Sequence, residues 1–287
     1  MSEATLPSAT TVGPVHLTVS NLDRSLPYYT ETVGLDALEQ DDTRALLGRD
    51  GRTLIGLVEE PDARPAPRTT GLYHFALLVP ERVNLARWLA HAARDRVPLV
   101  GLSDHDVSEA IYLRDPDGHG IEIYADRPRE RWEGKVDIRM TTLPLDVDSL
   151  LAELEDPAEA DFDGLPAGTT MGHVHLKVAD VPSAVAFYRD VLGLELTVAL
   201  GRQAAFFAAG GYHHHVGANT WESADGPPPS RGSASLRHAT IVVPMDGDRD
   251  AAVTRLRAAD VAVDETPDGP AFADPSGNRL VLLVAHD

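Results

Sequence analysis

The sequence contains no cysteine, and this absence excludes disulfides, thiolate metal sites and thiol nucleophiles. It also lacks any apolar run near the ~18 to 20 residues that a membrane-spanning helix needs. Its first eleven residues are small and polar, without the basic and apolar stretches of a secretory signal. Together these absences favour a cytoplasmic protein that does not enter a membrane.

Basic residues are also scarce, because 25 Lys and Arg stand against 45 Asp and Glu and give a net charge of −20. The negative electrostatic field of such a chain repels polyanions, and no cluster of basic residues reverses the field locally. We therefore expect no nucleic-acid partner. The acidity is explained by solubility. At 287 residues, of which 43% are hydrophobic, the chain is long enough for about two domains with cores of their own.

The chain repeats itself with an offset of 159 residues. Residues 15–35 read VHLTVSNLDRSLPYYTETVGL and residues 174–194 read VHLKVADVPSAVAFYRDVLGL, with seven identical positions. Asp115-Pro-Asp-Gly118 and Asp274-Pro-Ser-Gly277 keep the same offset. We therefore predict two homologous halves, 12–126 and 171–285, joined by an acidic, proline-containing linker over 127–170 with one short helix at 147–155.

Each half divides again into two units, in which an alternating strand leads into a helix and three short strands follow. The predicted class is α+β, with four βαβββ modules at about 12–60, 71–126, 171–222 and 236–285. In the first and third modules, Asn21 and Asp180 are candidate helix N-caps, and Gly34 and Gly193 occupy the position of a C-terminal glycine cap. Pro27 should weaken or kink the first helix.

This pattern resembles the vicinal-oxygen-chelate superfamily, which contains glyoxalases, bleomycin resistance proteins and extradiol dioxygenases. The resemblance rests on the strand and helix from Gly172 to Gly193 and on the Asp-Pro-x-Gly-x-x-x-Glu hairpin from Asp115 to Glu122. The phrases GLYHFA (71–76), DGHGIEIYAD (117–126) and GGYHHH (210–215) look most like bacterial catechol 2,3-dioxygenases. The resemblance implies modules that pair into two cup-shaped sheets, although the fold alone does not decide function.

Members of this superfamily take metal ligands from the first and last strands of two paired modules, so each such position can be inspected. Module one offers Pro14, which cannot bind metal. Modules two and three offer four candidate side chains, namely His74, Glu122, His173 and His215. Module four offers His238, but Val281 stands where a carboxylate would be needed. A complete site therefore requires modules two and three to face each other, which leaves modules one and four to form a metal-free cup.

The resemblance implies that His74, Glu122 and His173 bind Fe(II), since two histidines and a carboxylate form the facial triad of non-haem iron oxygenases. It also implies that His215, with Ala218 three residues later, is the acid–base residue. The alternation of a strand places His213 on the same face, so His213 is the alternative.

Two further side chains complete the predicted site. Tyr112 lies ten residues before Glu122, as in the extradiol enzymes, and can hydrogen-bond a substrate oxygen. His105 is expected to line the cup. His238 is interpreted as structural and His16 as inert, whereas His175 shares a face with His173 and could line the pocket.

The predicted function is extradiol cleavage of a catechol by O2, giving a product of the 2-hydroxymuconate semialdehyde type. One alternative is a glyoxalase-like lyase or isomerase with Ni(II) or Zn(II), for which His215 would be a fourth ligand. Another is a metal-free protein that sequesters small molecules. Exposed sheet edges and the acidic surface are compatible with a homodimer.

Overall fold

A computed structural model describes residues 5–155 and 161–285. Four βαβββ modules follow one another along the chain, as the sequence predicts. Module one contains β1 (Thr11–Val19), α1 (Leu22–Pro27), η1 (Tyr28–Val33), β2 (Asp36–Gln40), β3 (Arg44–Arg49) and β4 (Arg52–Glu59). Module two contains β6 (Gly71–Leu78), α2 (Arg82–Arg94), β7 (Leu99–Asp104), β8 (Ser108–Arg114) and β9 (Gly120–Asp126).

The second half repeats this order. Module three contains β11 (Thr170–Lys177), α5 (Val181–Val185), η4 (Ala186–Leu192), β12 (Glu195–Leu200), β13 (Ala204–Ala208) and β14 (Val216–Asn219). Module four contains β16 (Leu236–Val243), α6 (Asp246–Ala258), β17 (Asp264–Thr266), β18 (Gly269–Ala273) and β19 (Arg279–Val284). The short strands β5 (Arg64–Pro65) and β15 (Ser233–Ala234) pair with each other.

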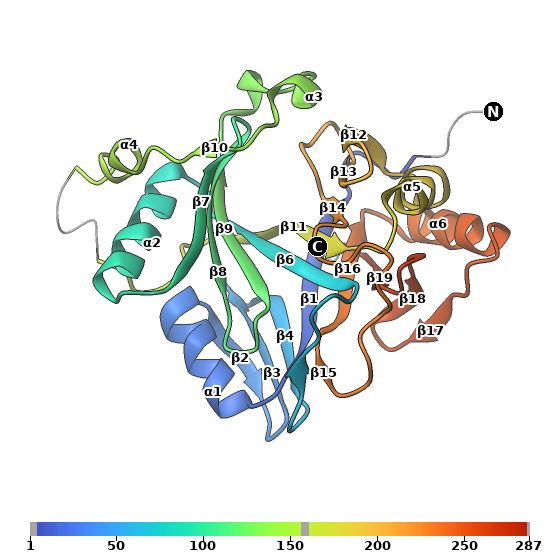
Figure 1. The fold of residues 1–287 in the computed structure, drawn as a ribbon, viewed down its shortest axis with the longest axis horizontal. Coiled ribbons are helices and arrows are strands. Elements are labelled where there is room, and N and C mark those ends of the chain that lie inside the picture. The colour runs from blue at the N-terminus through green and yellow to red at the C-terminus, as the bar shows by residue number, and fades with distance from the viewer. Residues whose placement is uncertain (1–4, 156–160, 286–287) are drawn as a thin grey trace.

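The modules pair across the two halves. One sheet has the order β10-β7-β8-β9-β6-β11-β14-β13-β12, so modules two and three share it, with β6 and β11 antiparallel at its centre. The other has the order β17-β18-β19-β16-β1-β4-β3-β2 and combines modules one and four. Helices α2 and α6 lie on the outer sides of these curved sheets (Figure 1). The α+β class and the predicted pairing are confirmed.

The helices of modules one and three share an unusual course. Asn21 and Asp180 cap their N-termini by accepting a backbone N–H bond three residues on. Each α-helix then widens into a π-helix that ends at a left-handed glycine, Gly34 or Gly193, with φ of 93° and 92°. Pro27 ends α1, but module three widens in the same way without a proline there. The widening of the first helix therefore does not require Pro27.

The connector, residues 127–170, is more than a linker. It contains η2 (Arg129–Arg131), α3 (Val136–Arg139), β10 (Leu143–Pro144) and α4 (Val147–Leu151). Strand β10 adds to the edge of the module-two sheet by pairing with β7. Helix α4 lies where a helix over 147–155 is predicted, but it ends at Leu151.

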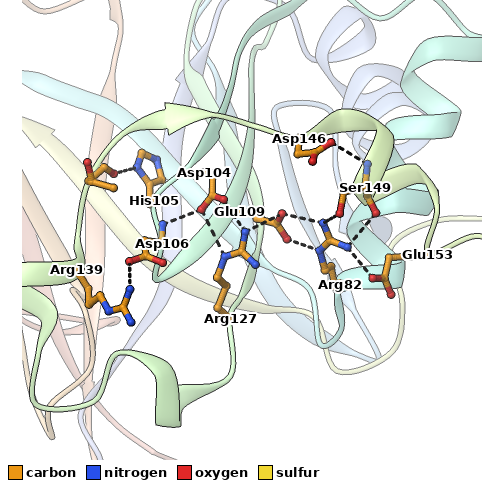
Figure 2. A network of polar contacts seen from close by, with 11 residues as sticks. Arg82, Asp104, His105, Asp106, Glu109, Arg127, Arg139, Asp146, Ser149 and Glu153 are labelled. Atoms are coloured by element: carbon orange, nitrogen blue, oxygen red, sulfur yellow. Dashed lines mark hydrogen bonds and ion pairs between the residues drawn. The ribbon is translucent and has the colours of Figure 1, made fainter.

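Ion pairs fasten the connector to module two (Figure 2). Arg82, the first residue of α2, binds Glu109 of β8 and reaches Glu153 at 2.6 Å. Arg127 also binds Glu109, whose side chain is only 2% exposed, at 3.1 Å. Because this carboxylate is buried and doubly paired, it holds Arg127 at the start of the connector directly, and it holds Glu153 farther along the connector through Arg82.

A single large hydrophobic cluster contains side chains from both sheets, including Leu17, Phe75 and Phe207. The two halves therefore share one core, and the boundaries 12–126 and 171–285 stay a prediction about the repeat. None of the helices in the described ranges is long and apolar enough to cross a membrane.

Candidate active site

Three neighbouring strands carry the predicted metal ligands. His74 lies on β6, His173 on β11 and Glu122 on β9. Ala76 of β6 pairs with Glu122 on one side and with His173 on the other. Because side chains two residues apart on a strand point to the same face, His74 lies on the face of Ala76, beside both partners.

The three side chains converge at a buried point. One donor atom from each of His74, Glu122 and His173 lies within 4.8 Å of the others. The Nε2 atoms of His74 and His173 lie 3.0 and 3.2 Å from the same Glu122 oxygen. All three residues are buried. The structure thus brings together the three residues that the sequence predicts as ligands, although they come from different halves.

The protonation states suit a cation. Burial lowers the pKa of His173 to about 4, against the opposing effect of Glu122. Burial alone would raise the pKa of Glu122, but the facing imidazoles of His173 and His74 hold it well below its ordinary range. At neutral pH, His173 is therefore neutral and Glu122 is ionised, which are the forms that bind metal.

The donor set also fits a metal on geometric grounds. His74 Nε2 is buried and has no hydrogen-bond partner, despite its 3.0 Å distance from Glu122. A buried ring nitrogen without a hydrogen bond is costly unless a further group satisfies it. Two imidazoles and one carboxylate are the donors of mononuclear non-haem Fe(II) sites.

A cavity of about 530 Å³ opens above these side chains, and Tyr112 and His105 line it as predicted. Tyr112 pairs with Glu122 across β8 and β9. His105 Nδ1 lies 2.7 Å from the Thr141 carbonyl, so it donates there and leaves Nε2 to accept from the Tyr112 hydroxyl at 2.8 Å. Burial and the Glu122 charge raise the pKa of Tyr112 well above 10, so its hydroxyl keeps its proton.

The three consecutive histidines take different positions. His214 lines the cavity, and its ring centroid lies 4.1 Å from that of His173. His215 does not line this cavity; its Nδ1 accepts the backbone N–H of Ala209 at 3.1 Å. The acid–base role of His215 remains a prediction, and its position does not favour that role. His213 is buried behind His214.

A chain of hydrogen bonds orients His214. The Nε2–H of His213 donates to Asp126 at 2.9 Å, which leaves Nδ1 of His213 as an acceptor. That atom lies 2.9 Å from Nδ1 of His214, which must then carry the proton. The Nε2 atom of His214 is consequently the basic one. Burial lowers the pKa of His214 well below 6.5, so the ring is neutral at pH 7.

Sequence reasoning missed several features of the cavity. It did not assign His214 or Asp126 a role. It treated Met140, Thr141 and Thr142 as linker, but all three line the cavity. His175 lines the cavity as anticipated, and burial lowers its pKa well below 6.5.

The second cup has no such triad among the described residues. His238 of β16 pairs with His16 of β1, and their rings stack with centroids 4.2 Å apart. Val281 occupies the position across from β16 that Glu122 occupies beside β6. Neither histidine belongs to the three converging ligands, and their interpretation as structural (His238) and inert (His16) stays a prediction.

The fold and the site define a class of protein. The family model described as the Glyoxalase/Bleomycin resistance protein/Dioxygenase superfamily matches residues 11–123 and 170–282. The chain therefore belongs to this superfamily, and the resemblance seen in the sequence is confirmed.

Similarity to individual proteins narrows the class. The chain is 40% identical to catechol-2,3-dioxygenase of Bacillus subtilis (strain 168) over 96% of its length and 97% of that protein. This confirms that the chain is an enzyme of the dioxygenase type. It is 27% identical to metallothiol transferase FosB of Staphylococcus epidermidis (strain ATCC 12228 / FDA PCI 1200), over 43% of this chain and 87% of that protein. Glyoxalase I from Zea mays shares the fold, with a TM-score of 0.57 at 15% identity, over 96% of this chain and 92% of that one.

Proposed function

We propose that this protein is an Fe(II)-dependent extradiol dioxygenase that opens a catechol ring with O2 and yields a product of the 2-hydroxymuconate semialdehyde type. One observation carries the proposal. His74, Glu122 and His173 converge in a cavity that also presents an oriented neutral imidazole and a tyrosine hydroxyl. The likeness to a catechol-2,3-dioxygenase over nearly the whole chain supports the same substrate class.

Fe(II), when bound by His74, Glu122 and His173, would lower the pKa of a catechol hydroxyl and bring the two substrates together. Three protein ligands leave positions for these substrates. The site is buried, with each ligand less than a tenth exposed. The low polarity of such a site strengthens the interactions of its few polar groups with a bound substrate.

The chain's own residues handle the protons. His214 Nε2 can accept the proton of a substrate hydroxyl and later return it to an oxygen of the opening ring. Tyr112 keeps its proton, which it donates to His105, and its hydroxyl oxygen can accept a hydrogen bond from a substrate hydroxyl. His105 holds the Tyr112 hydroxyl in place through Nε2. His214 thus takes the role that the sequence assigns to His215 or His213.

The two alternatives make different demands on the site. A glyoxalase-like enzyme needs a fourth ligand, but within the described residues the candidate ligand group has only three members. A metal-free binding protein would leave the buried His74 Nε2 without a hydrogen bond. We further propose a cytoplasmic location, which the absence of cysteine suits.

The test is anaerobic reconstitution with Fe(II), followed by catechol and oxygen. The proposal expects a yellow ring-cleavage product that forms only with Fe(II) and no longer forms once the iron is oxidised. An enzyme that uses Ni(II) or Zn(II) on another substrate would bind those metals and give no yellow product. A protein that binds no metal and keeps its ligand affinity with a chelator would refute both enzymatic functions.

A further inference from the structure

Four apolar side chains line the cavity and pack against one another: Val107, Met140, Val198 and Phe206. We call this set the apolar wall. Val107 precedes β8, Met140 belongs to the connector, and Val198 pairs with Phe206 between β12 and β13. The rings of Phe206 and His214 meet with centroids 5.1 Å apart. The apolar wall therefore begins next to the proposed acid–base residue.

The apolar lining continues to the surface. Val100 and Leu200 also line the cavity, although they are 59% and 50% exposed. Large apolar side chains exposed at the rim of a cavity mark a surface that apolar ligands contact. The volume of about 530 Å³ lies in the range that holds drug-sized ligands. A single unsubstituted ring at the triad would therefore leave part of the cavity unfilled.

Charge is nearly absent from this lining. Apart from the triad member Glu122, Arg114 is the only charged residue among the described residues that line the cavity. Arg114 ends β8, whereas Val107 precedes its first residue, so about 20 Å of strand separates them. The guanidinium donates to the Gly118 carbonyl and lies 3.8 Å from Glu222. No cation therefore faces the apolar wall from within the lining.

The contacts of the connector fix the apolar wall in place. Arg139, which precedes Met140, binds Asp106 at 2.9 Å, and Asp106 precedes Val107. The Thr141 carbonyl accepts from His105, which also holds Tyr112. Met140 thus lies between two anchored neighbours, Arg139 and Thr141. The contact of Thr141 continues through His105 to the Tyr112 hydroxyl in the active site. A substituent on the apolar wall and a ring at the triad would be oriented by the same segment.

We propose that the substrate is a catechol with an uncharged apolar substituent, alkyl or aryl, which packs on the apolar wall while the two hydroxyls face the triad. This inference rests on the proposed function and adds the substrate class. Each methylene that enters such a wall should strengthen binding by about fourfold. A carboxylate placed there would lose its water without gaining a cation, and its affinity should fall on the order of a hundredfold.

The experiment measures binding and turnover separately. Calorimetry on the iron-loaded protein without oxygen gives the Kd of catechol, of its 3- and 4-methyl, ethyl and propyl derivatives, and of 3,4-dihydroxybenzoate. Oxygenated assays give kcat/KM for the same compounds. Val198→Ala removes part of the apolar wall, and Val284→Ala, a partly buried valine on β19 in the other sheet, is the matched control.

The proposal expects affinity to rise with chain length in at least one alkyl series and 3,4-dihydroxybenzoate to bind weakly. Val198→Ala should weaken the propyl compound by about tenfold more than it weakens plain catechol, whereas Val284→Ala should change neither. A flat alkyl series would overturn the inference. So would tight binding of 3,4-dihydroxybenzoate that Arg114→Ala abolishes. Failure of every catechol to bind the iron-loaded protein would instead refute the proposed function.

Discussion

The roles of the adjacent residues His214 and His215 can be separated by one pair of substitutions. His214→Phe keeps an aromatic ring against His173 and Phe206 but removes Nε2, the nitrogen proposed as the base. Because His214 is not among the three converging ligands, iron and catechol should still bind. Ring opening should slow because the substrate hydroxyl loses its proton acceptor.

The expected size is that of a lost acid–base group in its active form. Burial keeps His214 neutral at pH 7, so essentially every enzyme molecule carries the base in its active form. Loss of a positioned acid–base group costs roughly 10² to 10⁴ in rate, which corresponds to about 3 to 5 kcal/mol in the barrier. The change also removes the hydrogen bond to His213 Nδ1, and an unpaired buried nitrogen lowers the free energy of unfolding by about 1 to 3 kcal/mol.

The assay is single-turnover ring cleavage, in which anaerobic enzyme loaded with catechol is mixed with oxygen, together with iron analysis of each variant. His215→Phe is the matched control, since it changes the neighbouring histidine in the same way. It should keep the iron and the rate but lose stability, because the Ala209 N–H is left without its acceptor. A slow His215→Phe beside an unaffected His214→Phe would refute this assignment.

Three other outcomes follow from the same contacts. Tyr112→Phe should keep iron but slow ring opening by about 10²-fold, because a hydrogen bond that positions the substrate is lost; single-turnover rates check this. Asp126→Asn should slow it about 10- to 100-fold with iron retained, since the His213 tautomer that orients His214 is no longer enforced; restoration by Asp126→Glu would separate this from general damage. Burial lowers the pKa of His215 to about 3, whereas an unfolded histidine has a pKa of about 6.5. The unfolded chain therefore binds more protons below pH 6.5, so the free energy of unfolding should fall as the pH drops from 6.5 towards 3. In urea titrations, this fall should be smaller in His215→Phe.

Much of the fold follows from local signals in the sequence. Alternating apolar residues, the caps Asn21 and Asp180, and the glycines Gly34 and Gly193 are recognisable because strand and helix boundaries depend on neighbouring residues. The pairing of modules two and three follows from the chemistry of candidate ligands, since only that arrangement completes a metal site. Both predictions therefore come from residue identity at fixed positions.

The position of His214 could not be predicted in this way. The period of two that places His213 and His215 on one face holds only inside a strand, and β14 begins at Val216. The three histidines belong to the preceding turn, where hydrogen bonds set the side-chain directions. The chief bond runs to Asp126, 87 residues away. Partners this far apart in the chain show no characteristic spacing, so a sequence pattern cannot reveal that they bind each other.

The role of the connector escaped prediction for a related reason. Its acidic, proline-containing composition is typical of a linker. Its position depends on ion pairs such as Arg139 with Asp106 and Arg127 with Glu109, which join segments that composition alone does not connect. Met140 thereby becomes part of the cavity.

We propose that His74, Glu122 and His173 hold one iron between the two halves of the chain. The most direct test is iron analysis after anaerobic reconstitution of His74→Ala, Glu122→Ala and His173→Ala. His238→Ala, at the same strand position in module four, is the matched control. We expect stoichiometric iron in the parent protein and in His238→Ala, and loss of iron in each of the other three. Full occupancy in any of those three, or loss in His238→Ala alone, would contradict it.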